Sequence, residues 1–324
     1  MLADLSVPGL ADGRFAPSPS GPLHLGNLRT ALLAWCFARS RSGRFLLRIE
    51  DLDPQRSRRE HERSIVTDLE RLGLDWDGAP LRQSEQLERH HAAFERLRAD
   101  GRLYRCWCTR AEIREALAAP HGAGAEGAYP GTCRRLSAAE QAQRERSGAP
   151  AAWRIDAGAE RVAFVDELAG ERVASVDDFV VWRSDQRLGG GLGLPAYNLA
   201  VVVDDAAEGI GEVVRGDDLA ETTPRQILLA RALGLAVPRY AHVPLVLTGD
   251  GRRLAKRDGA VTLSERLALG ESVEAVVGWM AASVGLAPPG TPRRASDVLA
   301  RFDAALIGRE PTRFDPTASL RPPA

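Results

Sequence analysis

The sequence predicts an α/β protein in which a Rossmann-type parallel-sheet domain carries an insertion and is followed by a helical C-terminal region. Strand-like runs alternate with helical runs from Arg14 to about Arg98, as expected for parallel strands that are covered by helices. The apolar run 199–204 suits another buried parallel strand, whose C-terminal end would carry the polar pair Asp204 and Asp205. These two observations define the predicted fold class.

Apolar spacing and turn-forming residues place the individual elements. The first is a short strand that ends near Ala16. We expect helices over residues 25–35, 59–72, 85–97 and 223–233, and strands over residues 45–49, 161–165 and 179–182. The segment 118–131 is rich in Gly, Ala and Pro and is predicted to be a flexible loop. From residue 264 the pattern is helical, and from residue 315 it is that of Pro-rich coil.

Changes in these patterns predict a division of the chain into four parts. Residues 1–105 and 191–248 would form the two halves of the Rossmann-type domain. Residues 106–190 would form an inserted subdomain, and residues 249–324 a lysine-bearing loop with the helical C-terminal region.

Composition narrows the possible partners. Hydrophobic residues make up 44% of the chain and charged residues 27%, which is ordinary for a globular protein, and the net charge of −1 argues against general polyanion binding. Any nucleic-acid surface must therefore be local, although each arginine cluster also fits a solvated face. The candidate clusters are Arg56, Arg58 and Arg59; Arg102, Arg105 and Arg110; and Arg134 and Arg135. No apolar run approaches the roughly 20 residues of a membrane span, and no signal peptide is recognisable, so we expect a cytoplasmic monomer without a membrane partner.

A single lysine stands out, because the other 42 of the 43 basic side chains are arginines. It is Lys256, within the segment 252–259. A lysine ammonium on its flexible stem is suited to following a phosphate group, whereas the arginine guanidinium is a rigid planar fork. Taken alone, Lys256 fits a solvated loop equally well.

A second segment, residues 13–27, reads as a short strand, a turn rich in Pro, Ser and Gly, and the start of a helix. Free backbone N–H groups at such a helix start point toward an anion. Gly26 would allow close approach of a nucleotide, and His24 can donate a hydrogen bond to a phosphate oxygen. An ordinary strand-to-helix connection with a capping histidine would have the same pattern.

Together the two segments resemble the two signatures of class I aminoacyl-tRNA synthetases, a His-x-Gly-His type motif and a Lys-Met-Ser-Lys-Ser type loop. Four further stretches resemble the glutamyl-tRNA synthetases in particular. These are residues 14–21, 48–54, 202–205 and 214–219, in the family's order, and the resemblance covers roughly residues 13 to 265.

The resemblance implies an enzyme that activates L-glutamate with ATP, forming glutamyl-adenylate and pyrophosphate, with Mg²⁺ sharing the phosphate charge. It implies that His24, Gly26, Asn27 and Lys256 bind ATP, with His24 and Lys256 as catalytic residues. The glutamate-binding positions carry over onto Arg14, Phe15, Ala16, Pro17, Ser18, Glu50, Tyr197 and Arg215.

The residue types of this glutamate site suit a dicarboxylic amino acid. Arg14 and Arg215 can each bind a carboxylate, Glu50 can pair with the α-ammonium group, and Tyr197 can donate its hydroxyl. The sequence leaves open which arginine takes the side-chain carboxylate. Surface ion pairs remain the alternative for Glu50 and Arg215.

The chain departs from the family pattern at three positions. Arg253 stands where the family has its first loop lysine, and Ala255 where it has a serine. The lost hydroxyl removes one possible phosphate hydrogen bond, worth about 1 kcal/mol. Asn27 replaces the second histidine of the early motif, a position that varies among glutamyl-type enzymes.

Three of the four cysteines are close together in the sequence, whereas Cys36 reads as a core residue of the first helix. In a cytoplasmic chain, the grouping of Cys106, Cys108 and Cys133 favours a metal over a disulfide, and thiolates favour Zn²⁺. The alternative is three unliganded thiols. As a fourth ligand the residues alone favour His121, because imidazole is the commoner zinc ligand.

A shortened group of relatives, the glutamyl-Q tRNA(Asp) synthetases, has a matching cysteine pattern in which the tyrosine at the Tyr129 position completes the site. The resemblance thus implies one structural Zn²⁺ bound by Cys106, Cys108, Tyr129 and Cys133, since four protein ligands leave no open position for water. The fold class expected is then a Rossmann-type catalytic domain with a zinc-bearing insertion.

The same group suggests the acceptor. The residues after the lysine loop are too few for the large anticodon-binding region of a full glutamyl-tRNA synthetase. The shortened relatives attach glutamate to the queuosine base in the anticodon of tRNA(Asp), so we expect ATP, L-glutamate and queuosine-bearing tRNA(Asp) as partners. Two alternatives are a truncated glutamyl-tRNA synthetase that charges the tRNA 3′ end and a non-catalytic tRNA-binding paralogue.

Overall fold

The structure is a computed structural model that describes residues 11–109, 111–113, 129–183, 193–254, 258–259 and 261–320. Several residues of interest lie outside this range, namely Arg110, His121, Ala255 and Lys256. Most of the predicted loop 118–131 does so as well.

The core of the fold is a parallel sheet in two halves. In the first half, β2 (Phe45–Ile49) lies between β1 (Gly13–Phe15) and β3 (Leu81–Arg82). In the second half, β10 (Glu212–Gly216) pairs with β11 (Arg239–Val243). The halves meet where the N–H groups of Gly211 and Glu212 both donate to the Asp12 carbonyl, at 3.0 and 3.1 Å.

The resulting strand order is β3-β2-β1-β10-β11, so the direction in which strands are added reverses between β1 and β10. A crevice opens at the carboxyl ends of the strands beside such a reversal, and this is where open α/β sheets bind ligands. The fold therefore places residues that follow β1 and residues that follow β10 at one site.

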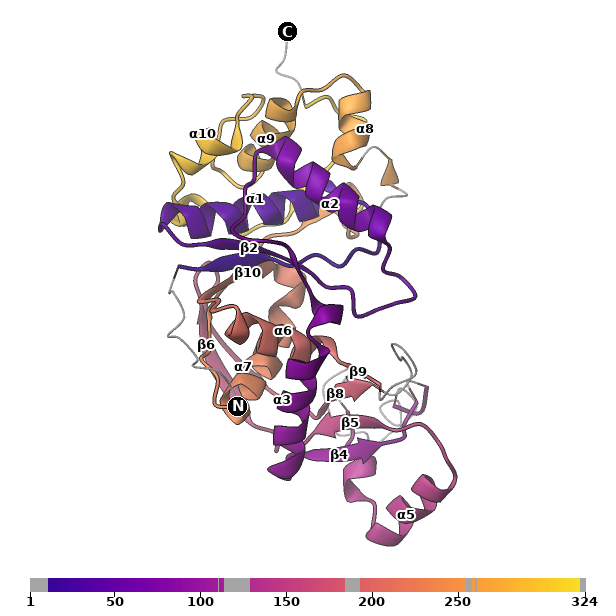
Figure 1. Cartoon of the computed structure of the whole chain (residues 1–324). Helices are drawn as coiled ribbons and strands as arrows, with labels where there is room; N and C mark the ends of the chain where they lie inside the picture. Colours follow the sequence, from indigo (N-terminus) through magenta and orange to yellow (C-terminus); the bar gives the residue numbers. More distant parts are fainter. Residues whose placement is uncertain are drawn as a thin grey trace.

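Helices cover both faces of the sheet (Figure 1). On one face lie α1 (Leu25–Ser40) and α2 (Arg59–Leu72), together with the C-terminal helices α8 (Leu263–Ala268), α9 (Val273–Ala282) and α10 (Ala295–Leu299). On the other face lie α6 (Tyr197–Ala207) and α7 (Thr223–Ala232), with α3 (Leu87–Ala99) beside α6. Each layer has its own hydrophobic cluster of buried side chains.

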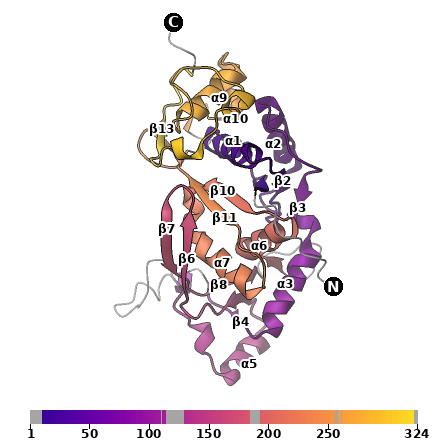
Figure 2. The same cartoon turned by 90° about the vertical axis from the view of Figure 1, so that its left-hand side faces the viewer.

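A second, antiparallel sheet forms the opposite end of the molecule from the C-terminal helices (Figure 1). Its strands, in spatial order, are β4 (Leu103–Cys106), β5 (Ala152–Ile155), β8 (Phe179–Arg183) and β9 (Leu194–Pro195). Helix α5 (Ala138–Arg146) packs at its far edge. The hairpin of β6 (Arg161–Asp166) and β7 (Gly170–Ser175) joins this part to β11 (Figure 2).

A two-stranded parallel sheet joins the C-terminal part to the core. Strand β12 (Val246–Thr248) runs parallel to β13 (Thr312–Phe314). Arg29, on α1, is almost fully buried and donates hydrogen bonds to Ser283, Thr312 and the Pro244 carbonyl. Burial lowers the pKa of Arg29 to about 10. Four short 3₁₀ turns complete the described elements: Gln83–Glu85, Cys133–Arg135, Asp217–Thr222 and Ala304–Leu306.

The predicted α/β class with its parallel sheet is confirmed, as are the helical C-terminal region and most predicted elements. The prediction of a strand over residues 199–204 is wrong, because this run lies within α6. Helix α6 is buried on nearly all sides, so its residues are apolar all around the helix. A short apolar run of this kind does not distinguish a buried helix from a buried strand. The four-part division of the chain stays a prediction.

Candidate active site

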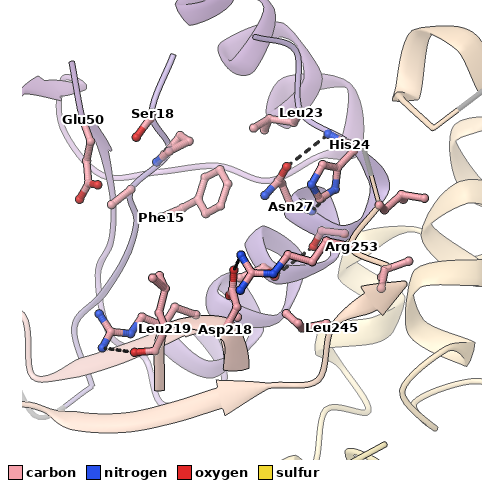
Figure 3. Close-up of a pocket in the computed structure, with 18 of the residues that line it drawn as sticks. Phe15, Ser18, Leu23, His24, Asn27, Glu50, Asp218, Leu219, Leu245 and Arg253 are labelled. Carbon is pink, nitrogen blue, oxygen red and sulfur yellow. Dashed lines mark hydrogen bonds and ion pairs between the residues drawn. The ribbon is translucent and has the colours of Figure 1, made fainter. Parts of the chain in front are cut away.

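A pocket of about 600 Å³ opens at the carboxyl ends of β1 and β10 (Figure 3). All the predicted ATP-binding and glutamate-binding residues that the structure describes line it. They are Arg14, Phe15, Ala16, Pro17, Ser18, His24, Gly26, Asn27, Glu50, Tyr197 and Arg215. Residues that are far apart in the sequence are thus brought together by the strand order.

The early motif forms the N-terminus of α1, at one wall of the pocket. The His24 backbone N–H donates to the Asn27 side chain, and the Asn27 N–H donates to Nδ1 of His24, both at 3.3 Å. This reciprocal cap fixes the imidazole at the helix start, where the dipole favours an anion. A Cβ on Gly26 would lie 3.0 Å from the His24 ring and 3.3 Å from Val246, so a glycine is needed for this packing.

The segments that flank the sole lysine adjoin the same helix start. Arg253 and Leu254 line the pocket. On the other side of the gap, the Val261 carbonyl accepts the Leu25 N–H at 2.8 Å, and Thr262 bridges to His24. Arg253 also forms an ion pair with Asp218 at 3.0 Å, visible in Figure 3. Lys256 itself lies outside the described residues, but the residues before the gap line the pocket and those after it contact the start of α1.

One arginine of the pocket, Arg14, already has an internal counter-ion. Its guanidinium contacts the Asp205 carboxylate at 3.0 Å, and both side chains are buried. Asp205 also pairs with Arg48 at 2.7 Å. Although burial raises the pKa of Asp205, these two arginines outweigh it and hold that pKa below its usual value. The α6 residue Asp205 therefore helps to orient Arg14.

Glu50 lies at the edge of this cluster. Burial raises its pKa to about 7, against the opposing charges of Arg48 and Arg14. The nearest Arg48 nitrogen is 3.6 Å from the Glu50 carboxylate, so the two groups form only a loose ion pair. A ligand ammonium group next to Glu50 would stabilise its carboxylate form.

The second arginine, Arg215, has a different environment. Only 5% of its surface is exposed, yet its hydrogen-bond acceptors are all neutral. They are His242 Nε2 (3.2 Å), Tyr197 Oη (3.4 Å), Gln226 Oε1 (2.8 Å), the Leu219 carbonyl (3.3 Å), Thr222 Oγ1 (3.5 Å) and Thr223 Oγ1 (2.7 Å). Within the part of the chain that the structure describes, Arg215 has no carboxylate partner. The pocket thus contains a buried cation beside open space.

Several of these supporting residues were missed at the sequence level. Asp205 was assigned to the end of a strand, and Arg48 was part of a quoted motif without a role. Gln226, Thr223 and His242 were not singled out. The one usable signal is His242, an ionisable side chain within the apolar strand β11.

The three clustered cysteines form a second candidate site, at the end of β4. The sulfur atoms of Cys106, Cys108 and Cys133 lie within 4.8 Å of one another and can hold a metal ion. The Tyr129 hydroxyl lies 3.4 Å from the Cys106 sulfur and 3.6 Å from that of Cys108, and it accepts the Cys133 N–H at 2.9 Å. A tetrahedral zinc site has S···S and S···O separations of roughly 3.8 and 3.6 Å. The four groups therefore fit one such ion.

The chemistry of the thiols agrees with a site for a cation. A hydrogen bond from Cys106 and the N–H of Trp107 lower the pKa of Cys133 to about 6, despite burial. The same hydrogen bond and burial raise the pKa of Cys106 to about 12. One buried cation is already in place, because Arg154 donates to the Cys106 sulfur at 3.2 Å and lies 3.9 Å above the Tyr129 ring.

Each arginine cluster considered as a nucleic-acid surface contains an arginine that is paired with an acidic neighbour. Arg59 pairs with Glu62, Arg105 with Glu145, and Arg134 with Asp156 and Asp178. These contacts favour solvated ion pairs over free phosphate-binding positions at these residues.

Comparisons with known proteins agree with this site. The family model for the catalytic domain of class I tRNA synthetases (E and Q) matches residues 12–280. A glutamyl-Q tRNA(Asp) synthetase of Nocardia farcinica is 53% identical and one of Symbiobacterium thermophilum 50% identical. The alignments cover 99% of both chains in the first case, and 93% of this chain and 95% of the relative in the second.

A solved structure leads to the same family. The crystal structure of a glutamate tRNA ligase from Elizabethkingia meningosepticum, in complex with its amino acid, superposes with a TM-score of 0.77 at 28% identity. The superposition covers 93% of this chain and 66% of that one. None of the described helices has the length and apolar character needed to cross a bilayer. The chain belongs to the class I tRNA synthetases of the glutamate and glutamine type.

Proposed function

We propose that this chain is a glutamyl-Q tRNA(Asp) synthetase, which activates L-glutamate with ATP and transfers it to the queuosine base in the anticodon of tRNA(Asp). The observation that carries the proposal is a single pocket lined by the early signature and by the start of the lysine loop. Arg215 lines it too, and is buried without a carboxylate partner among the described residues. The near-complete alignment with glutamyl-Q tRNA(Asp) synthetases supports the acceptor. By contrast, a similar glutamate–tRNA ligase of Geobacter sulfurreducens is covered over only 55% of its length.

Glutamate would bind between the carboxyl ends of β1 and β10. Arg215 and Arg14 would bind its carboxylates and Glu50 its ammonium group, with Tyr197 donating its hydroxyl. The backbone of Phe15, Ala16, Pro17 and Ser18 would form the floor of the pocket. Because Arg14 is already paired with Asp205, we assign the stronger carboxylate contact to Arg215.

ATP would bind at the start of α1. His24 would donate a hydrogen bond to a phosphate oxygen, while Gly26 and Asn27 leave room for the nucleotide at the helix N-terminus. Mg²⁺ accompanies ATP and shares the phosphate charge. Lys256 would stabilise the charge that develops on the phosphates when the glutamate carboxylate attacks the α-phosphorus, because both ends of its loop are at this wall.

We further propose that the cysteine cluster binds one structural Zn²⁺ through Cys106, Cys108, Tyr129 and Cys133. The three thiol ligands favour zinc, and the separations around the Tyr129 hydroxyl suit a fourth ligand there. The ion would hold β4 against the segment 129–133. We expect the protein to act as a monomer.

Glutamate-dependent exchange of pyrophosphate into ATP tests the activation step. The wild-type protein should catalyse it, and Lys256→Ala should lower the exchange rate about a hundredfold, because a cation is lost where charge develops. Lys256→Arg is the matched control, since it keeps the charge and should retain part of the rate. A near-normal rate in Lys256→Ala would mean that the sole lysine has no catalytic role.

Transfer of radiolabelled glutamate identifies the acceptor. We expect product on tRNA(Asp) that contains queuosine, and none on the same tRNA with unmodified guanine at that position. Product on tRNA(Glu) alone would identify a truncated glutamyl-tRNA synthetase instead. Absence of both exchange and transfer would favour a non-catalytic paralogue.

A further inference from the structure

We propose that Asp166 and His242 form a positioning pair that orients Arg215 toward the ligand and keeps it without an internal counter-ion. This inference deepens the proposed function and rests on glutamate being the ligand. Neither residue lines the pocket, so both would act only through the guanidinium.

His242 lies in direct contact with Arg215. This side chain, on β11, lies next to Arg215 on β10, because the two residues are register partners in the parallel sheet. Its Nε2 atom is 3.2 Å from Arg215 Nε and 3.1 Å from Thr223 Oγ1. An arginine Nε–H can only donate, so Nε2 must present its lone pair.

Asp166, at the end of β6, uses one carboxylate oxygen to accept the Leu168 and Ala169 N–H groups, at 3.0 and 2.8 Å. Its other oxygen accepts Nδ1 of His242 and the His242 backbone N–H. Four donors hold the carboxylate, and the carboxylate in turn fixes the imidazole proton on Nδ1.

Burial holds the pKa of His242 below its usual value, and the Arg215 charge acts in the same direction against Asp166, so the ring is neutral near pH 7. A neutral imidazole therefore separates the Asp166 carboxylate from the Arg215 cation. A carboxylate in direct contact would neutralise Arg215, as Asp205 neutralises Arg14.

The consequence concerns specificity. A buried guanidinium with only neutral partners gains most from a ligand that brings a full negative charge. A carboxylate meets this condition, whereas the amide of glutamine does not. The pair would thus help the pocket to select glutamate by leaving Arg215 both oriented and unpaired.

Asp166→Asn is the decisive variant. Leu168 and Ala169 present two backbone N–H donors, whereas the His242 side presents only one that cannot change, because Nδ1 can lose its proton. The amide oxygen should therefore face Leu168 and Ala169, and the amide NH₂ should face His242. The imidazole would then accept at Nδ1 and carry its proton on Nε2, directed at the Arg215 Nε–H, as happens when the aspartate of a serine-protease triad is changed to asparagine. We expect KM for glutamate in pyrophosphate exchange to rise about tenfold or more, while KM for ATP changes less than about twofold.

Two substitutions of His242 provide an independent test, because one keeps a hydrogen-bond acceptor for Arg215 and the other removes it. His242→Gln retains an oxygen acceptor for Arg215 and should cost only a few-fold in KM for glutamate, whereas His242→Leu removes it and should cost about tenfold. In the His242→Gln background, Asp166→Asn should add almost nothing, because no tautomer remains to be reversed. Asp68→Asn, at a buried aspartate of α2 outside the pocket, is the matched control and should leave KM unchanged.

Any one of the following results would overturn the inference: an unchanged KM for glutamate in Asp166→Asn, an equal rise in KM for ATP, or an undiminished effect of Asp166→Asn beside His242→Gln. Equal KM values for His242→Leu and His242→Gln would do so as well. Failure of the proposed function is distinguishable, because the wild-type protein would then show no glutamate-dependent exchange at all.

Discussion

Two parts of the molecule each bury an arginine that has no carboxylate partner among the described residues. In the pocket, Arg215 is surrounded by neutral acceptors and faces open space. In the cysteine cluster, Arg154 is buried against a thiol sulfur, an aromatic ring and the Asp178 carbonyl. Burial of an unpaired charge is unfavourable, so in each place an anion is expected to complete the arrangement.

The difference between the two parts lies in where that anion comes from. Around Arg154 the chain would supply it if the cluster binds the proposed ion, since three metal-bound thiolates would carry negative charge in excess of a divalent ion. Around Arg215 none of the described residues supplies one, so we expect the anion to arrive from solution. On the proposed function, the same residue type would thus support a permanent structural site at one end of the molecule and an exchangeable ligand site at the other.

The strongest test of this comparison is Arg215→Gln. We expect kcat/KM for glutamate to fall about a hundredfold or more, because a ligand carboxylate would be buried without a cation. Pyrophosphate exchange measures the loss. Bound metal per chain, measured on the same preparation, should stay at the wild-type value. Loss of metal together with glutamate binding would indicate general unfolding and would remove the distinction between the two sites.

Arg154→Gln tests the other half of the comparison. Without the guanidinium beside the Cys106 sulfur, the affinity for zinc should fall about ten- to a hundredfold, as for other changes around metal ligands. Competition with a chromogenic chelator measures it. Cys36→Ala changes a buried thiol outside the cluster and should retain wild-type affinity. If Arg154→Gln holds zinc as tightly as the wild type, Arg154 is not the counter-ion of the cluster.

A smaller effect is expected from pH, and it tests the proposal that Glu50 binds the ammonium group of glutamate. Because burial raises the pKa of Glu50 to about 7, the free pocket holds a protonated Glu50 below that pH and must release the proton to bind an ammonium group. KM for glutamate should therefore fall as pH rises toward 7, by up to about tenfold per unit, and level off above it. Glu50→Gln should bind weakly at every pH without this slope. A flat wild-type profile from pH 6 to 8 would contradict the assignment.

Much of the fold and the pocket could be predicted from the sequence. The helix 59–72 and the strand 45–49 have clear periodicity and appear at the predicted residues. The proposed glutamate and ATP positions come from the family resemblance, and those that the structure describes line one pocket. Tyr129 was placed at the cysteines only by the family resemblance, and it lies there.

Other features depend on contacts that no local pattern records. Helix α6 was taken for a strand because burial on nearly all sides removes the amphipathic signal. The pairing of Arg14 with Asp205 joins residues 191 positions apart. His242 and Asp166 become relevant only because β11 lies between β10 and β6 in the sheet. Such arrangements are set by tertiary structure, which a single sequence does not show directly.

The parallel pairing of β12 with β13 has a consequence for synthesis on the ribosome. Strand β12 leads directly into the lysine loop, yet its partner residues, 312–314, are translated much later. Until they emerge, the edge of β12 is unpaired and Arg29 lacks the Thr312 hydroxyl. A nascent chain that already contains the proposed catalytic residues His24 and Lys256 would therefore still lack this strand pairing, and we expect ATP binding to appear late in co-translational folding.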